Sequence, residues 1–411
     1  MVEVGVVPIM LDNNMDFGLI NQVLVDYNPE FIWLPSVSKS KFIEMGYKEV
    51  WGGFSYVLLR TADPTNVSMH NDLAILLSTS GSTGSCKMVR QSYRNIQVNT
   101  ESIIQYLHID SSQRAILILP MHYTFGLSVI NTHLYSGAVI LLSNKSLMQK
   151  QLWEFIQAKK ATSISGVPYT YEMLKKLRFF SMDLPYLKTM TQAGGKLSQQ
   201  LHQEFATFAK SNDKEFIVMY GQTEATARMG YLPADRSLEK CGSIGIAIPN
   251  GEFSLLDSQG AVVDQNDEQG ELVYRGENVA LGYAYDRSSL SKGDEFGGVL
   301  YTGDIAKKDN DGYYYIVGRK SRFIKMFGRR ISLDDVDCIV ENKFKDMEAK
   351  SSGTDDLIYI FITQEKCKEV KELVCNVLRL PHTAIKVKYI HTLPRNGAGK
   401  ILYSKLEEHY D

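Results

Sequence analysis

Short apolar runs alternate with helix-like stretches through the middle of the chain, and this alternation constrains the fold more than any other feature. Residues 115–119 (AILIL) and 138–142 (AVILL) have the length and composition of buried strands. Helix-like stretches separate them from the next strand-like runs, at residues 163–165 and 216–219. Because strands that alternate with helices form parallel sheets covered by helices, we expect an α/β fold of layered sheets.

The pattern changes at about residue 242, where short strand-like runs with turn signals begin. Asp311-Gly312 lies between two such runs and is typical of a hairpin. Residues 242–319 therefore predict a β-rich subdomain. After a basic segment, residues 332–390 alternate two helix-like and two strand-like stretches, which predicts a second, compact unit.

The length of 411 residues exceeds the size at which one hydrophobic core usually stops growing, so we expect at least two domains. The patterns divide the chain into a large N-terminal domain over residues 1–319 and a small α+β C-terminal domain over residues 320–411. A net charge of −2 gives no field that would attract nucleic acid or membrane, so neither is an expected partner.

The pattern of cysteines and the lack of targeting signals predict the cellular compartment of the protein. The five cysteines are scattered without a C-x-x-C pair or zinc-ligand spacing, so we expect reduced thiols. The first residues lack the basic segment of a signal peptide, and no window reaches the roughly 20 apolar residues of a membrane span. We therefore expect a cytoplasmic protein without a membrane span.

The stretch STSGSTGSCKM, residues 78–88, directly follows an apolar run and predicts a loop after a strand. Its backbone N–H groups, hydroxyls and one ammonium suit a phosphate. The Walker A pattern is absent, because Gly81 and Gly84 are too close together and Met88 follows Lys87. A P-loop nucleotidase is disfavoured, and a solvated Ser/Gly turn is the alternative.

Three further motifs carry polar groups that suit a nucleotide. In YGQTE, Glu224 follows a strand-like run and could hold Mg²⁺ beside a phosphate, or be an ordinary loop acid. In YTGD, Asp304 could accept ribose hydroxyls or form a turn. In LPRNGAGK, a glycine-rich loop could deliver the charge of Lys400 to a reacting centre, or be solvated.

Together the four motifs resemble, in order and spacing, those of the adenylate-forming (AMP-binding) superfamily of acyl-CoA synthetases, luciferases and peptide-synthetase adenylation domains. The resemblance covers about residues 72–405. It implies that a carboxylate attacks the α-phosphate of ATP to form an acyl-adenylate, and that a thiol then accepts the acyl group. The implied cofactors are ATP, Mg²⁺, and either CoA or the phosphopantetheine of an acyl carrier protein. A non-catalytic or regulatory nucleotide-binding relic is the alternative.

The resemblance also implies a role for each motif residue. The β- and γ-phosphates would be bound by Thr79, Ser80, Gly81, Ser82, Thr83, Gly84 and Lys87. The adenine and the adjoining acyl pocket would be lined by Tyr220, Gly221, Gln222, Gly194, Gly195 and Lys196. The ribose would contact Asp304 and Arg319. The catalytic residues would be Thr223 at the α-phosphate, Glu224 as the Mg²⁺ ligand, and Lys400 between carboxylate and α-phosphate.

The stretch LPMHYTFG, residues 119–126, resembles the segment that lines the carboxylate pocket, with His122 and Tyr123 locally exchanged. Peptide-synthetase domains place an Asp where this chain has Gly126, and a buried ammonium without a partner is costly. An α-amino acid is therefore disfavoured, and a plain or hydroxylated carboxylic acid is favoured. Arg228 indicates a polar or short acyl chain, with a structural salt bridge as the alternative.

The resemblance implies that the C-terminal domain is mobile and swings about a hinge at Ser321, where the family usually has Asp or Lys. The basic segment RKSRFIKMFGRR could meet CoA phosphates or an acidic carrier-protein helix, or could be a solvated strand and turn. Only about seventy residues precede the phosphate loop, fewer than is usual in the family. We expect a short member that lacks part of the N-terminal region, and its exposed surface makes a homodimer or partner contact plausible.

Overall fold

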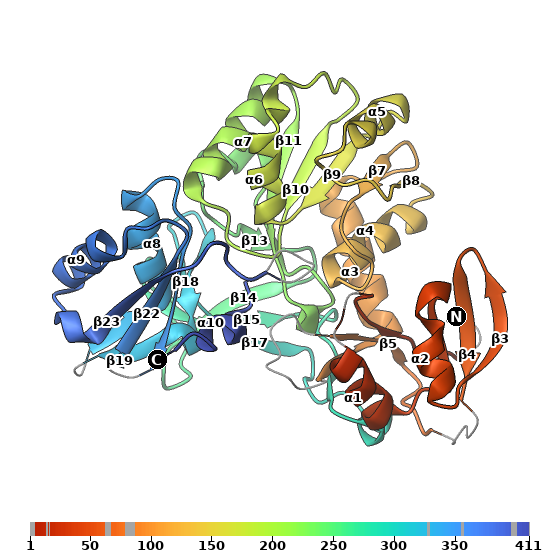
Figure 1. The fold of residues 1–411 in the computed structure, drawn as a ribbon. Helices are drawn as coiled ribbons and strands as arrows, with labels where there is room; N and C mark the ends of the chain where they lie inside the picture. The colour runs from red at the N-terminus through yellow and green to blue at the C-terminus, as the bar shows by residue number, and fades with distance from the viewer. Residues whose placement is uncertain are drawn as a thin grey trace.

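The structure is a computed structural model. It describes residues 5–13, 15, 17–61, 67–78, 87–326, 329–354, 357–395 and 401–410. Figure 1 shows the seven-stranded sheet with its helices, the smaller β-sheets below it, and the C-terminal unit on one side. No helix in these ranges is long and apolar enough to cross a membrane.

The seven-stranded sheet has the order β13-β12-β11-β10-β9-β7-β8. Its strands are β7 (Arg114–Leu117), β8 (Val139–Leu142), β9 (Ser163–Gly166), β10 (Thr189–Gln192), β11 (Glu215–Tyr220), β12 (Gly230–Tyr231) and β13 (Ile246–Ala247). Strands β7 to β11 pair in parallel, as the alternation of apolar runs and helices predicts. Strands β12 and β13 extend the sheet in the antiparallel sense.

Helices cover both faces of this sheet. They are α3 (Tyr93–Leu107), α4 (Thr124–Tyr135), α5 (Lys150–Ala158), α6 (Pro168–Lys176) and α7 (Gln199–Ser211). Alternate residues of a strand point to opposite faces. In β11, Ile217 and Met219 pack with residues of α3 and α4, whereas Phe216 and Val218 pack with residues of α5 to α7. The buried apolar run therefore serves two cores at once.

A four-stranded sheet of order β1-β5-β6-β16 flanks the predicted phosphate loop. Its strands are β1 (Ile9–Met10), β5 (Leu73–Ser78), β6 (Met88–Ser92) and β16 (Gly282–Ala284). Strands β5 and β6 are antiparallel, so they bring the two ends of residues 79–86 together. Strand β16 pairs antiparallel with β6, which brings a segment from much later in the chain beside this loop.

The β-rich region forms a second four-stranded antiparallel sheet. It contains β14 (Glu252–Leu256), β15 (Gln269–Arg275), β17 (Val299–Lys308) and β18 (Tyr314–Arg319). The predicted hairpin at Asp311-Gly312 is confirmed, since β17 and β18 pair on either side of it and Gly312 has a φ of 85°. The region is not self-contained, because β13 joins the large sheet and β16 joins β6. The boundaries of the expected subdomain and domains stay predictions.

Residues 17–60 form a three-stranded sheet, order β2-β4-β3, and two helices. They are α1 (Phe17–Tyr27), β2 (Phe31–Pro35), α2 (Lys39–Glu44), β3 (Lys48–Gly53) and β4 (Tyr56–Arg60). Trp33 stacks on Trp51 and on Tyr56, and all three side chains are exposed. The homodimer or partner contact expected for this region stays a prediction.

The C-terminal unit has its own hydrophobic core. Its elements are β19 (Phe323–Met326), β20 (Arg329–Ser332), α8 (Leu333–Lys343), β21 (Ala349–Thr354), β22 (Leu357–Ile362), α9 (Cys367–Leu378), β23 (Ile385–Tyr389) and α10 (Tyr403–Glu407). The two predicted helices and two predicted strands are present as α8, β22, α9 and β23. Strand β21 was not predicted, because its sequence AKSSGT lacks an apolar alternation.

Candidate active site

The candidate site lies where the parallel strands β10 and β11 end at their carboxyl edge, which is where open α/β sheets bind ligands. Gly194 and Gly195 follow β10, and the YGQTE motif spans the end of β11 and a 3₁₀ turn over Thr223–Ala225. Gly221 allows this turn, because a Cβ there would lie 1.6 Å from the carbonyl oxygen of Ala227. Any side chain at this position would displace the motif.

Three side chains converge on the buried carboxylate of Asp304, which is 3% exposed. The hydroxyl of Tyr220 donates to Oδ2 at 2.5 Å, and the amide of Gln222 donates to the same oxygen at 3.1 Å. Arg319 Nε lies 3.1 Å from Oδ1, because β17 and β18 pair Asp304 directly with Arg319. The fold thus unites residues from two of the four motifs.

The protonation of Tyr220 keeps this cluster in one hydrogen-bonding arrangement. Burial, and then the neighbouring Asp304 carboxylate, raise the pKa of Tyr220 well above its ordinary value. The phenol is therefore a hydrogen-bond donor at neutral pH. A carboxylate has about four acceptor positions, so Asp304 keeps capacity for the two hydroxyls of a ribose.

A second cluster joins Lys87 to Glu224 through Tyr283. Lys87 Nζ lies 3.4 Å from the centroid of the Tyr283 ring, and the Tyr283 hydroxyl donates to Glu224 Oε1 at 3.0 Å. Burial, and then Glu224, raise the pKa of Tyr283 above its ordinary value. The amide of Gln91 donates to the carbonyl of Thr223 at 2.9 Å. The ammonium of Lys87 therefore lies over the face of the Tyr283 ring, and the carboxylate of Glu224 lies at its hydroxyl. Lys87 directly follows the phosphate loop.

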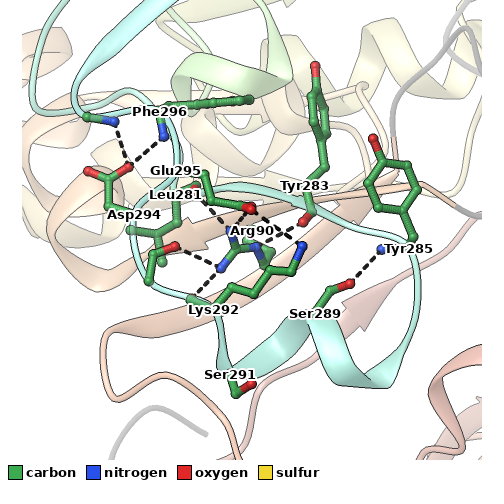
Figure 2. Close-up of polar contacts among 12 residues, drawn as sticks. Arg90, Leu281, Tyr283, Tyr285, Ser289, Ser291, Lys292, Asp294, Glu295 and Phe296 are labelled. Carbon is green, nitrogen blue, oxygen red and sulfur yellow. Dashed lines mark hydrogen bonds and ion pairs between the residues drawn. The ribbon is translucent and has the colours of Figure 1, made fainter.

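Arg90 holds the segment that carries Tyr283 (Figure 2). Its fully buried guanidinium donates to the carbonyls of Leu281, Tyr283, Lys292 and Gly293 at 2.5–3.2 Å. It also pairs with Glu295 Oε2 at 2.5 Å. The motifs in the sequence did not predict a role for Arg90, Gln91 or Tyr283. A lone arginine within an otherwise uncharged strand, three residues after Lys87, was the signal available for Arg90.

The predicted acyl-pocket residues gather around the start of α4. Gly194 has a φ of 83°, and a Cβ there would lie 2.3 Å from the hydroxyl of Tyr123 and 3.2 Å from a methyl of Val167. At Gly126, a Cβ would lie 2.3 Å from the carbonyl oxygen of Pro120. The absence of an Asp at position 126 thus has a steric reason in the backbone, apart from the choice of substrate.

His122 and Lys196 make contacts outside this group. His122 Nε2 lies 3.7 Å from Asp12 Oδ2; burial lowers the pKa of His122, and the Asp12 carboxylate partly offsets that effect. Lys196 Nζ lies 3.4 Å from the carbonyl oxygen of Ile316 in β18, so it reaches towards the antiparallel sheet. Arg228 is buried and pairs with no acid among the described residues, so the salt bridge offered as an alternative is not found there.

The protein-family model described as AMP-binding enzyme matches residues 21–284, which is more than half of the chain. The chain belongs to this family. The matched residues include two of the four motifs, STSGSTGSCK and YGQTE.

Similar proteins of this family are acid–CoA ligases. The 2-succinylbenzoate–CoA ligase of Listeria monocytogenes is 24% identical over 99% of this chain and 85% of its own length. A long-chain-fatty-acid–CoA ligase of Escherichia coli is 27% identical over 82% of this chain, which spans 62% of that protein. The o-succinylbenzoate CoA synthetase of Bacillus subtilis, solved with its acyl-adenylate intermediate, has a TM-score of 0.70 at 25% identity over 84% of this chain and 71% of that one. The expected layered α/β fold and acid–thiol ligase family are confirmed.

The described residues could bind a Mg²⁺ ion only if a bound ligand supplied most of the oxygen atoms that coordinate the ion. No group of three His, Cys, Asp or Glu side chains in the described ranges could hold a metal alone. Mg²⁺ is commonly bound by one or two carboxylates together with substrate phosphates. Glu224 uses one oxygen for Tyr283, and Lys87 marks where phosphates would lie, so a shared site fits this AMP-binding enzyme.

Two predicted groups lie outside the described residues: the phosphate-loop residues Thr79–Gly84 and the catalytic Lys400. The lysine loop is the LPRNGAGK motif, residues 393–400, and its first three residues are described. Arg395 lies 5.5 Å from the centroid of the Tyr169 ring in α6 and pairs with Glu348 at 2.7 Å. Since Tyr169 follows Val167 closely in sequence, the lysine loop starts beside the acyl-pocket residues.

The hinge region and the basic segment are only partly free to meet a ligand. Ser321 lies in a 3₁₀ turn over Lys320–Arg322, and nothing is described of its side chain. Lys320 pairs with Glu271 at 2.7 Å. Arg322 pairs with Asp334 at 2.6 Å and Asp337 at 2.7 Å. Acids from other elements therefore pair with these two cations, and contact of the basic segment with CoA phosphates or a carrier-protein helix stays a prediction.

Proposed function

We propose that this chain is an ATP-dependent carboxylic acid:CoA ligase that works through an acyl-adenylate. The observation that carries the proposal is the convergence of Tyr220, Gln222 and Arg319 on Asp304, beside the Lys87–Tyr283–Glu224 cluster. The first cluster suits a ribose and the second suits phosphates. Gly194, assigned to the acyl pocket, follows β10, the strand that pairs with β11.

In the first half-reaction, a carboxylate oxygen of the acid attacks the α-phosphorus of ATP and the bond to pyrophosphate breaks. Asp304 would orient the ribose, and Thr223 at the end of β11 would contact the α-phosphate. Lys87 would neutralise the departing pyrophosphate. A Mg²⁺ ion held by Glu224 would supply further positive charge to the phosphate oxygens. Positioning and charge neutralisation are the main requirements of phosphoryl-type transfer.

In the second half-reaction, a thiolate attacks the acyl carbonyl carbon and AMP leaves. We assign CoA as the thiol, because the named relatives are CoA ligases. The phosphopantetheine of an acyl carrier protein is the second acceptor to be tested. The free thiols of Cys241, Cys367 and Cys375 suit a reducing compartment, so we place the enzyme in the cytoplasm.

Exchange of radiolabelled pyrophosphate into ATP, measured with a panel of carboxylic acids, tests the first half-reaction. We expect exchange with at least one acid, and a loss of about 100-fold or more in Glu224→Gln, because that change removes charge at the transferring phosphate. Glu239→Gln, at an exposed ion pair with Arg236, is the matched control and should retain exchange. Measurable ATP binding without exchange for any acid would instead identify a non-catalytic nucleotide-binding protein.

A further inference from the structure

Tyr283, in β16, contacts two charged residues of the candidate phosphate site, Lys87 and Glu224. Its backbone is held because β16 pairs with β6 and the Tyr283 carbonyl accepts the Nε–H of Arg90 at 3.1 Å. Its ring is held because Phe296 packs edge-on against it, with the ring centroids 5.2 Å apart. Figure 2 shows the ring pointing away from the guanidinium that fixes its backbone. The ring is therefore a fixed surface beside the two charges.

The hydroxyl of Tyr283 orients the carboxylate of Glu224. It donates to Oε1 at 3.0 Å. Burial, and then Glu224 itself, raise the pKa of Tyr283 above its ordinary value, so the phenol keeps its proton and stays a donor. The backbone of Glu224 is held as well, because its carbonyl accepts the N–H of Ala280 at 2.9 Å. Oε2 accepts no hydrogen bond from the described residues, so one oxygen of an oriented carboxylate is left for a metal ion.

The ring of Tyr283 separates two opposite charges. Lys87 Nζ lies 3.4 Å from the ring centroid, and in the part of the chain that the structure describes no ion pair joins Lys87 to Glu224. Opposite charges attract, so a direct pair is the arrangement that an unliganded site would otherwise favour. Such a pair would occupy both the ammonium and the carboxylate that a metal-bound triphosphate needs. The aromatic face and the hydroxyl instead give each charge its own partner.

We propose that Tyr283 is a positioning residue with two separable tasks. Its hydroxyl orients Glu224 towards Mg²⁺, and its ring keeps Lys87 from pairing with Glu224, so that the ammonium is available to the phosphates. Both tasks rest on the proposed ligase function, which makes ATP with Mg²⁺ the ligand. Tyr283 makes no bond to the reacting atoms and acts through its two neighbours.

Calorimetric titration with ATP, in excess Mg²⁺ and again in EDTA, tests the hydroxyl separately from the ring. Tyr283→Phe removes only the hydroxyl. We expect its dissociation constant for ATP to rise about tenfold in Mg²⁺, because a hydrogen bond to a charged group is lost, and to be unchanged in EDTA. Tyr285→Phe removes an exposed hydroxyl two residues away and is the matched control (Figure 2). It should bind ATP like the wild type under both conditions.

Tyr283→Leu removes the ring as well. We expect its dissociation constant for ATP in EDTA to rise at least about threefold, because Lys87 then pairs with Glu224. Adding Glu224→Gln should improve metal-free binding by a larger factor than the same change does in the wild type, since a neutral amide forms no ion pair with the ammonium. A loss of packing alone predicts no such rescue. Tyr283→Phe keeps the ring, so the hydroxyl can be tested even if Tyr283→Leu does not fold.

Two results would overturn this role of Tyr283. One is an equal loss of ATP affinity by Tyr283→Phe in Mg²⁺ and in EDTA, because a purely structural hydroxyl predicts that result. The other is a Tyr283→Leu variant that folds and binds metal-free ATP like the wild type. If the expected binding results come without pyrophosphate exchange for any acid, the ligase function is refuted and the role of Tyr283 stands. A wild-type protein that does not bind ATP would refute both.

Discussion

At the scale of single residues, Asp304 is the point on which the candidate nucleotide site depends. It is buried, yet it accepts hydrogen bonds from Tyr220 and Gln222 and pairs with Arg319. Three partners from two segments fix both carboxylate oxygens. Such a carboxylate is pre-oriented for a ligand, because little reorganisation is left to occur on binding.

Tyr220→Phe removes one of the three partners and keeps the ring. A hydrogen bond to a charged group contributes about 1.5–3 kcal/mol, and Gln222 and Arg319 remain. We therefore expect the KM for ATP to rise roughly tenfold in exchange assays, with little change in melting temperature. Tyr301→Phe, which removes an exposed hydroxyl nearby in β17, is the control. An equal KM in both variants would contradict the role of the Tyr220 hydroxyl.

At the scale of elements, β6 organises the phosphate side of the site. This short strand begins directly after Lys87, pairs with β5 and β16, and carries both Arg90 and Gln91. Arg90 binds four carbonyls of the β16 segment, and Gln91 binds the carbonyl of Thr223. One strand thus connects the phosphate loop, the Tyr283 ring and the end of β11.

Arg90→Lys tests this connection. A lysine retains the charge but cannot reproduce the planar fork that reaches several carbonyls and Glu295. We expect the free energy of unfolding to fall by about 2–3 kcal/mol, because buried carbonyls lose their donors. Exchange activity should fall as well, since Tyr283 is no longer held. The measurements are denaturant unfolding and pyrophosphate exchange.

The control for this element is Arg94→Lys, at the exposed ion pair with Glu277. A change in an exposed ion pair alters the free energy of unfolding by at most about 1 kcal/mol. If Arg90→Lys unfolds at the same denaturant concentration as Arg94→Lys, Arg90 does not hold the β16 segment against β6.

At the scale of the whole molecule, side-chain and backbone contacts join the C-terminal unit, which Figure 1 shows on one side, to the rest of the chain. Arg395 lies over the ring of Tyr169 in α6, and the backbone N–H of Arg319 donates to Asp334 of α8 at 3.1 Å. The first contact brings the start of the lysine loop beside the candidate acyl pocket. This arrangement suits the adenylating half-reaction, in which Lys400 is proposed to neutralise charge.

Lys400→Ala should therefore separate the two half-reactions. We expect pyrophosphate exchange to fall by at least about 100-fold, because one positive charge is lost from the transition state. Formation of the thioester from supplied acyl-adenylate and CoA should be largely retained. Lys405→Ala, in α10, is the control and should leave both steps intact. Equal loss of both steps in Lys400→Ala would argue against this role.

Local sequence patterns are sufficient to predict the alternating strands and helices of the large sheet and the four motifs. Apolar alternation and turn residues act over a few neighbours, so they are readable locally, as the parallel strands β7 to β11 and the hairpin at Asp311-Gly312 demonstrate. The polar strand β21 was missed for the same reason, since its pairing with β22 is not encoded in a local apolar pattern.

The three-dimensional fold determines which distant side chains meet. Tyr220 and Asp304 are 84 residues apart, and Arg90 and Glu295 are 205 apart. It also decided what is absent, namely an acid beside Arg228 among the described residues. Contacts of this kind depend on the path of the whole chain and on the burial it creates. A motif therefore predicts a chemistry, whereas the fold decides which side chains lie together.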